Sequence, residues 1–153
     1  MKKGKAFIVV SHRRMGKTET LTALSGGTLA RRILIDGTRF PVRRMSNDED
    51  DQGFFDLLEY KYPDSQPYII LAMCPTFKED RRRLPLIAAL ERFSQRYDLF
   101  FFVLGRKENP VQKRMRQKEV AVMESFGVVE IFRRSTEAAS RARAFRKFIE
   151  AHM

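Results

Sequence analysis

Residues 6–18 read AFIVVSHRRMGKT, an apolar, β-branched run followed by a basic segment that ends in GKT. The apolar run is typical of a buried strand, and residues 18–24 have a helical composition that ends at the glycine pair 26–27. A strand that passes through a short loop into a helix points the N–H groups of the first helical turn toward the loop. Together with the positive end of the helix dipole, these N–H groups favour an anion. The stretch therefore predicts a phosphate-binding loop between a strand and a helix.

The alternation of strand and helix continues along the chain. Apolar runs predict five strands, at residues 6–11, 32–36, 68–73, 99–104 and 128–132. Helical patterns follow them at residues 18–24, 52–60, 85–97, 109–126 and 136–149, and a long charged loop is expected at 38–51. We expect one α/β domain over residues 1–153, with three layers: a mostly parallel five-stranded sheet and helices on both of its faces.

The composition limits the kinds of protein that this chain can be. Lys and Arg number 30 against 19 Asp and Glu, and the resulting net charge of +11 favours a polyanionic partner. The longest apolar run is far too short to span a membrane, and the basic N-terminus lacks a signal-peptide core. The single cysteine, Cys74, excludes an internal disulfide and a cysteine-based zinc site. We therefore expect a cytoplasmic protein with no membrane partner.

Residues 11–18, SHRRMGKT, resemble the Walker A motif of the P-loop NTPases, G-x-x-x-x-G-K-[ST], with Ser11 in place of the first glycine. The arginine-rich loop is similar to those of terminase-type packaging ATPases and of some AAA-like ATPases. The resemblance implies that the chain binds ATP, or another purine nucleoside triphosphate, with Mg²⁺. It also implies that Lys17 neutralises the β- and γ-phosphates and that the Thr18 hydroxyl ligates the metal. The nucleotide-binding residues that it implies are Ser11, His12, Arg13, Arg14, Met15, Gly16, Lys17, Thr18 and Glu19.

P-loop NTPases also use an acid at a strand end to hold Mg²⁺ and polarise water. The third and fourth predicted strands lead into Cys74 and Gly105, and the acid at the end of a predicted strand is Asp36. Asp36 is therefore a candidate catalytic and metal-binding residue. The segment LIDG around it is similar to the second strand of small-molecule kinases such as adenylylsulfate kinase, with Arg39 just beyond. The alternative for Asp36 is an ordinary strand end before a glycine turn.

Positive charge is clustered at loop ends and on the C-terminal helices. The candidate polyanion contacts are Arg81, Arg82, Arg83, Lys113, Arg114 and Arg116. Arginine suits bidentate contacts with phosphate, so DNA or RNA is a candidate partner, although surface helices also carry such charge routinely. The acidic run at 48–51 is expected to favour the start of the next helix rather than to bind a cation.

These features together favour an ATPase that works with nucleic acid or a nucleoprotein assembly. A homo-oligomer or a larger protein assembly is a further candidate, because a neighbouring subunit often completes the site of such an ATPase. Two alternatives stay open: a small-molecule or nucleotide kinase, and a non-catalytic module that binds a nucleotide or nucleic acid.

Overall fold

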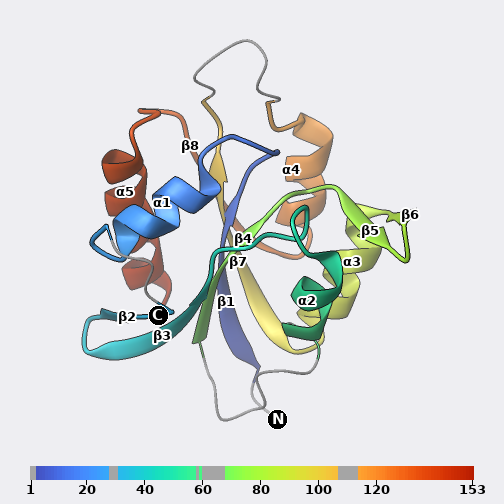
Figure 1. Cartoon of the computed structure of the whole chain (residues 1–153), viewed down its shortest axis with the longest axis horizontal. Helices are drawn as coiled ribbons and strands as arrows, with labels where there is room; N and C mark the ends of the chain where they lie inside the picture. Colours follow the sequence, from blue (N-terminus) through green and yellow to red (C-terminus); the bar gives the residue numbers. More distant parts are fainter. Residues whose placement is uncertain (1–2, 28–30, 58, 60–67, 107–113) are drawn as a thin grey trace.

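The chain folds into a central sheet that is covered by helices on both faces (Figure 1). A computed structural model describes residues 3–27, 31–57, 59, 68–106 and 114–153. The sheet has the strand order β2-β3-β4-β1-β7-β8. Its strands are β1 (Gly4–Val10), β2 (Arg32–Ile35), β3 (Thr38–Arg43), β4 (Tyr68–Met73), β7 (Tyr97–Leu104) and β8 (Gly127–Phe132). A separate hairpin consists of β5 (Phe77–Glu79) and β6 (Arg82–Leu84). The helices are α1 (Lys17–Leu24), α2 (Asp51–Asp56), α3 (Leu86–Ser94), α4 (Gln117–Glu124) and α5 (Ala138–His152).

Strand β1 lies inside the sheet and pairs in parallel with β4 and β7. The register sets Val10 opposite Met73 on one side and Val103 on the other, so the carboxyl ends of these strands lie together. Residues 6–10 are 0% exposed, because helices cover both faces of the strand. Ligands of such sheets bind just outside the carboxyl ends of the strands, and residues 11–16 leave β1 at this edge.

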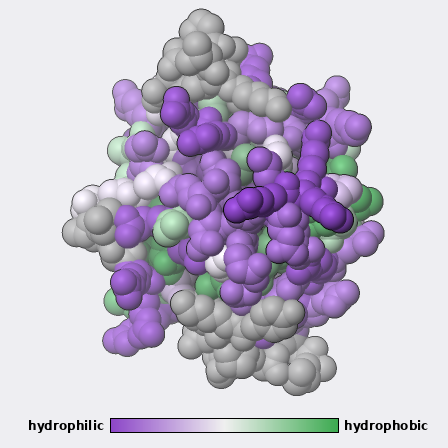
Figure 2. All heavy atoms as spheres, turned by 45° about the vertical axis from the view of Figure 1, so that its right-hand side comes forward, coloured by the Kyte–Doolittle hydropathy of each residue, from purple (hydrophilic) through white to green (hydrophobic). Residues whose placement is uncertain are grey.

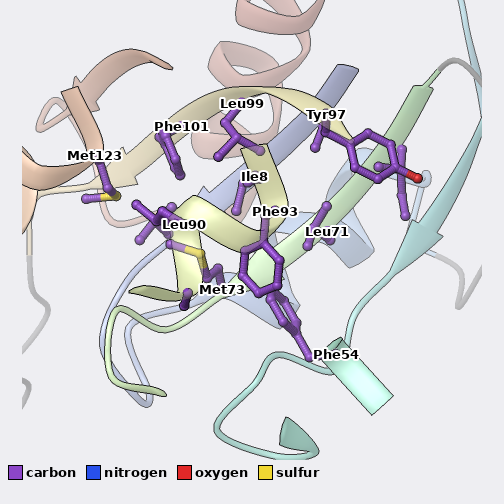
Figure 3. Packing of buried hydrophobic residues seen from close by; sticks show 14 of the residues in the cluster. Ile8, Phe54, Leu71, Met73, Leu90, Phe93, Tyr97, Leu99, Phe101 and Met123 are labelled. Carbon is purple, nitrogen blue, oxygen red and sulfur yellow. The ribbon is translucent and has the colours of Figure 1, made fainter. Parts of the chain in front are cut away.

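Two apolar clusters, one on each face of the sheet, hold the three layers together. On one face, Leu21 of α1 and Phe145 of α5 pack with Phe7 and Phe102 of the sheet. On the other face, α2, α3 and α4 cover the sheet, and burying one large apolar side chain in this way contributes about 1.5–3 kcal/mol. Figure 3 labels members of this second cluster: Ile8, Phe54, Leu71, Met73, Leu90, Phe93, Tyr97, Leu99, Phe101 and Met123.

The structure confirms an α/β chain with a mostly parallel sheet, but the sheet has six strands where five were expected. The additional strand is β3, in the segment that was expected to be a charged loop. Its arginines and Pro41 make the strand hard to recognise from the sequence, because proline is uncommon inside a sheet. The pairing of β3 with β4 involves Val42 and Arg43, at the end of β3.

Strand β2 runs antiparallel, which corrects the expectation that it belongs to the parallel set. It pairs with β3 through a tight turn at Asp36 and Gly37, whose φ angles are +49° and +76°. Asp-Gly favours this left-handed conformation in hairpins. Because β3 is parallel to β4 and β4 to β1, the carboxyl end of β2 points to the sheet edge opposite the carboxyl end of β1.

Several element bounds differ from the prediction. Strand β4 has the predicted bounds, whereas β7 and β8 begin earlier than expected. Helix α4 begins at Gln117, well after the predicted start at 109, although residues 107–113 lie outside the described residues. Over the ranges that the structure describes, no helix is long and apolar enough to cross a membrane. Figure 2 shows that hydrophilic residues cover most of the side of the molecule that carries α3 and α4.

Candidate functional site

The β1–α1 loop, residues 11–16, precedes Lys17 and Thr18 of α1 and lies at the carboxyl edge of the sheet, where the sequence predicted it (Figure 1). Its first residue extends the pairing of β1 with β4, because the Ser11 N–H donates to the Met73 carbonyl at 3.2 Å. Arg14 and Gly16 have left-handed φ angles of +63° and +98°. Left-handed residues in a turn direct successive N–H groups to one side and form a concavity that suits an anion. The loop therefore contains left-handed positions of the kind found in anion-binding turns.

Ser11 takes the first position of the motif without backbone strain. Among the described residues, the non-glycine residues with a positive φ lie at other positions, so glycine is not required here. The Ser11 side chain is 1% exposed, and its hydroxyl donates to the His12 carbonyl at 2.9 Å. The departure from the motif is therefore compatible with the conformation of the loop.

The side chain of Lys17 fills the inside of the β1–α1 loop. Its Nζ donates to the carbonyl of Ser11 at 3.0 Å and to that of His12 at 3.2 Å, and the residue is 6% exposed. Burial lowers the pKa of Lys17 below its ordinary value, and the negative charge of Asp48 is the largest effect that opposes this shift. A charge-assisted bond to phosphate is stronger than a bond to a neutral carbonyl. Lys17 is thus a buried cation that gains from an anion in the loop.

A hollow of about 560 Å³ lies beside the loop, and we call it the loop hollow. Its size is within the range of small-molecule sites. It brings together the β1–α1 loop, the segment before α2, the end of β4 and strand β5. The lining residues are His12, Arg13, Arg14, Asn47, Asp48, Asp51, Cys74, Thr76 and Lys78.

Asn47 ties the segment before α2 to the end of β4. Its Nδ2 donates to the carbonyls of Cys74 at 2.9 Å and Thr76 at 2.8 Å, and its Oδ1 accepts the Cys74 N–H at 2.7 Å. The residue is 3% exposed, so water competes little for these bonds. Asp48, the next residue, is thereby held at the loop hollow. A neighbouring segment thus brings a carboxylate to the strand end where β4 itself has none.

His12 anchors the loop to α4. Its Nε2 donates to Oε1 of Glu119 at 2.8 Å, and the residue is 4% exposed. Burial alone would lower the pKa of His12, but hydrogen bonds with Cys74 and Glu119 outweigh burial, so the pKa is raised above its ordinary value. Glu119 also accepts the backbone N–H of Arg116, the N-cap residue of α4, at 2.9 Å. His12 therefore joins the loop to the first turn of this helix.

The raised pKa of His12 predicts that stability falls at alkaline pH. The folded chain holds the His12 proton more tightly than the unfolded chain, whose value is near the ordinary 6.5. This contribution is fully present below that value and is lost as the pH rises through the folded pKa. We expect the melting temperature to fall from about pH 6 to about pH 9 more steeply in the wild type than in Glu119→Gln. Thermal unfolding followed by circular dichroism measures both slopes, and equal slopes would contradict this role of the pair.

Arg141 of α5 supports the loop from the side of the sheet that α5 covers. The residue is 2% exposed and donates to the carbonyls of Met15 at 2.8 Å, Arg106 at 2.6 Å and Ser135 at 3.3 Å. One guanidinium thus joins the loop, the end of β7 and the start of α5. A Cβ atom at Gly16 would lie 2.4 Å from Nη1 of Arg141, so both the space and the positive φ require glycine there.

The predicted nucleotide-binding residues form the β1–α1 loop and the start of α1, but they do not all line the loop hollow. Arg13 and Arg14 are exposed and line it. Thr18 and Glu19 are exposed in the first turn of α1 and line neighbouring hollows. The Met15 side chain is 2% exposed, so this residue offers its backbone rather than its side chain to a ligand of the loop.

The structure does not bring Asp36 to the loop. Asp36 lies in the β2–β3 turn, at the sheet edge opposite the carboxyl end of β1, and Arg39 lies near the same turn. The Asp-Gly hairpin reverses β2 and thereby moves its end away from the site. This placement corrects the expectation that Asp36 serves the loop as a catalytic and metal-binding residue.

The candidate polyanion contacts lie in separate places. Arg82 and Arg83 of β6 line another hollow, together with Glu79 and Asp80, and Arg81 is in the turn before them. Arg114 and Arg116 are exposed before α4, and Lys113 lies outside the described residues. The β5–β6 hairpin contributes Lys78 to the loop hollow.

Oxygen donors near the loop suit a Mg²⁺ ion that is bound mainly through a nucleotide. Thr18 is exposed at the start of α1, and the carboxylates of Asp48 and Asp51 line the loop hollow. Mg²⁺ is commonly held by one or two carboxylates and by phosphate oxygens, with water filling the other positions. In the part of the chain that the structure describes, no group of three or more His, Cys, Asp or Glu residues could hold a metal ion.

The site residues that were not predicted include Asn47, Asp48, Lys78, Glu119 and Arg141. Glu119 follows a helix-capping pattern, but nothing local connects it with His12, which is 107 positions away. Arg141 follows the basic pattern of an ordinary surface helix, although it is buried. Only pairing information between distant positions would have found these contacts.

The fold and the loop together define an α/β protein whose central strand leads through a basic loop into the first helix. No protein-family model matches the chain, and no curated protein matches it either. What the chain binds is therefore inferred from the geometry of the loop and its surroundings.

Proposed function

We propose that this chain is a nucleotide-binding protein of the P-loop NTPase type, which binds ATP or another purine nucleoside triphosphate with Mg²⁺ at the β1–α1 loop. The observation that carries the proposal is the buried Lys17 ammonium, held by loop carbonyls at the carboxyl end of β1. Phosphate oxygens would replace these carbonyls as its partners, and the N–H groups at the start of α1 would add to the attraction. Arg13 and Arg14 would contact the outer phosphate oxygens, because both are exposed beside the loop.

We further infer that the chain hydrolyses the nucleotide. A bound Mg²⁺ would neutralise charge on the β- and γ-phosphates, with Thr18 and Asp48 as the residues that hold it directly or through water. Asp48 would also orient the attacking water and accept its proton. The water oxygen forms a bond to the γ-phosphorus as the bond to the bridging oxygen breaks, and the diphosphate leaves with that electron pair. Asp48 fits this role because Asn47 fixes the segment at the end of β4.

The proposal includes a partner. The net charge of +11 favours nucleic acid or a nucleoprotein assembly in the cytoplasm. Oligomerisation, or a place in a larger protein assembly, would bring further catalytic groups to the loop. Hydrolysis is therefore expected to be faster when the partner is present.

Calorimetric titration with Mg-ATP, with and without single-stranded DNA or RNA, tests this function. We expect saturable binding of Mg-ATP, weaker binding without Mg²⁺, and release of inorganic phosphate that increases when the polynucleotide is added. Absence of both heat and phosphate release under all these conditions would overturn the proposal. Binding without phosphate release would favour the alternative of a non-catalytic module.

Asp48→Asn is expected to slow phosphate release by about 100-fold, because general-base catalysis typically contributes at least this much. Mg-ATP affinity is expected to change much less, since Lys17 and the loop N–H groups remain. Asp36→Asn removes the same charge from the β2–β3 turn and is the matched control, with a rate close to that of the wild type. If Asp36→Asn were the slower variant, the placement of the catalytic acid at Asp48 would be wrong.

The structure weakens the kinase alternative in the form derived from the sequence. That alternative places Asp36 and Arg39 beside the acceptor, whereas both lie toward the edge of the sheet opposite the loop. Transfer to a small acceptor would then need other residues, and ADP formation that depends on such an acceptor would favour it over hydrolysis.

A further inference from the structure

A second hollow, of about 740 Å³, lies next to the first turn of α1. Four arginines line it, two from the chain that enters β2 and two from the end of β3. We call it the arginine hollow. Its lining residues are Thr18, Arg31, Arg32, Pro41, Val42, Arg43, Arg44, Met45, Glu49 and Leu57.

The β2–β3 hairpin explains why these arginines converge. In the antiparallel register Arg32 is opposite Pro41, and the Val42 N–H donates to the Arg31 carbonyl at 2.8 Å. The residues that precede β2 therefore lie beside those that follow β3. Two arginine pairs that are separate in the sequence thus form one basic surface, and the parallel pairing of β3 with β4 directs it to the loop edge of the sheet.

The arginine hollow has a large excess of positive charge. Its lining contains four arginines and one acid, Glu49. Arg43 is engaged, because its Nη2 bonds to Asp50 at 3.1 Å and its Nε donates to the Met45 carbonyl at 3.0 Å. Among the described residues, the other three arginines take part in none of the ion pairs. By contrast, Arg82 and Arg83 share their hollow with two acids. The excess charge therefore distinguishes the arginine hollow from the predicted arginine run.

We propose that the arginine hollow binds the phosphate groups of a second ligand, the backbone of a single-stranded nucleic acid, beside the nucleotide site. Arginine guanidinium groups match phosphate oxygens in bidentate geometry, and side chains from two strands can follow successive phosphates. Thr18, which lines the arginine hollow, lies in the first turn of α1 directly after the β1–α1 loop, and Glu49 of the same hollow adjoins Asp48 of the loop hollow. A strand bound here contacts the start of α1 and the segment that carries Asp48. The statement that the strand lies beside a nucleotide rests on the proposed function, whereas the binding of phosphate in the arginine hollow does not.

The test compares two double variants that remove the same charge. Arg32→Gln/Arg44→Gln changes the arginine hollow and keeps Arg43 with its structural bonds. Arg143→Gln/Lys147→Gln changes a smaller basic hollow of about 330 Å³ on α5, and serves as the control. The probe is a fluorescein-labelled single-stranded DNA of about 20 nucleotides, longer than the site of a single binding domain, titrated at several salt concentrations.

We expect the arginine-hollow variant to bind the oligonucleotide at least ~10-fold more weakly at moderate salt, while the control stays within ~2-fold of the wild type. The negative slope of log affinity against log salt should become less steep by about 1.4 in the first variant, because each of the two lost contacts contributes about 0.7 on a single strand. Equal losses in both variants, or a larger loss in the control, would overturn the proposal. So would a wild-type chain that does not bind the oligonucleotide.

Two further measurements separate this proposal from the proposed function and identify the source of the phosphate. Calorimetry with Mg-ATP should give the same affinity for the arginine-hollow variant as for the wild type. Lys17→Ala should no longer bind Mg-ATP and should still bind the oligonucleotide. A wild-type chain that binds the oligonucleotide but not Mg-ATP would overturn the proposed function and leave this inference standing. A thymidine dinucleotide with a 5′-phosphate is the competitor. Strong competition at equal concentration would show that the arginine hollow binds a short phosphorylated molecule and would overturn the proposal. Weak competition would support binding of a nucleic-acid backbone.

Discussion

Replacing Lys17 by alanine is expected to reduce Mg-ATP affinity by at least 100-fold and to leave the chain folded. Each hydrogen bond to a charged partner contributes about 1.5–3 kcal/mol, and 1.4 kcal/mol corresponds to a tenfold change in affinity. Lys17 presents its ammonium inside the loop, bonded to two carbonyls that phosphate can replace. Without it, the loop keeps its N–H groups but loses the buried ammonium that bonds to the carbonyls of Ser11 and His12. Titration calorimetry measures the change in affinity.

The stability of the Lys17→Ala variant is the necessary companion measurement. The ammonium is buried, and the cost of its desolvation offsets its two bonds to carbonyls, so its removal is expected to change the free energy of unfolding by no more than about 1 kcal/mol. Lys118→Ala, on the exposed start of α4, is the control for the loss of one positive charge. Mg-ATP affinity within threefold of the wild type in the folded Lys17→Ala variant (a change of about 0.6 kcal/mol) would exclude the loop as the phosphate site.

Replacing Arg141 by alanine is expected to lower the free energy of unfolding by about 3 kcal/mol. Removing a buried arginine side chain leaves its hydrogen-bond acceptors unsatisfied, and each unpaired buried acceptor costs about 1–3 kcal/mol. The acceptors here are the buried carbonyl of Met15 and the carbonyls of Arg106 and Ser135, whose bonds to Arg141 are half-buried, so the expected loss is far below three full penalties. Because one of them belongs to the β1–α1 loop, amide hydrogen exchange in residues 13–17 should also become faster. Denaturant unfolding and exchange measured by mass spectrometry provide the two readouts.

Two variants define how the Arg141 result is interpreted. Arg143→Ala, on an exposed position of the same helix, should change stability by less than about 0.5 kcal/mol. Arg141→Lys should not restore the wild-type value, because an ammonium lacks the planar fork that reaches several carbonyls at once. Full rescue by lysine, or equal effects at both arginines, would show that Arg141 contributes charge rather than specific bonds.

The parts of the fold that could be predicted are those in which local sequence and tertiary environment agree. Strands β1, β4 and β7 are apolar because both of their faces are covered, so their sequences alone indicate buried strands. The β1–α1 loop could be placed because its motif lies directly between such a strand and a helix. Strand β3 could not be placed, since it carries arginines and Pro41 and its pairing with β4 involves only its last residues.

The antiparallel direction of β2 is indicated locally by Asp36-Gly37, which the resemblance to kinases instead assigns to a catalytic strand end. Asp-Gly between two short extended runs is typical of a tight hairpin, and the turn has that geometry. Taking the same Asp as a catalytic strand end moved it to the wrong edge of the sheet. The carboxylate at the loop hollow, Asp48, was visible only as part of an acidic run before a helix. Its placement depends on Asn47, whose partners are 27 and 29 positions away, and no local pattern reports such a contact.

The link between Arg141 and the β1–α1 loop also affects how the protein matures during synthesis. The guanidinium and the Met15 carbonyl that it binds are separated by 126 positions, so the loop emerges from the ribosome long before its support. At about 5–20 residues per second, the delay is about 6–25 s. Strand β7, which completes the pairing of β1, also arrives late in translation. A nascent chain therefore carries the loop motif for many seconds before Arg141 can hold the loop in its final shape.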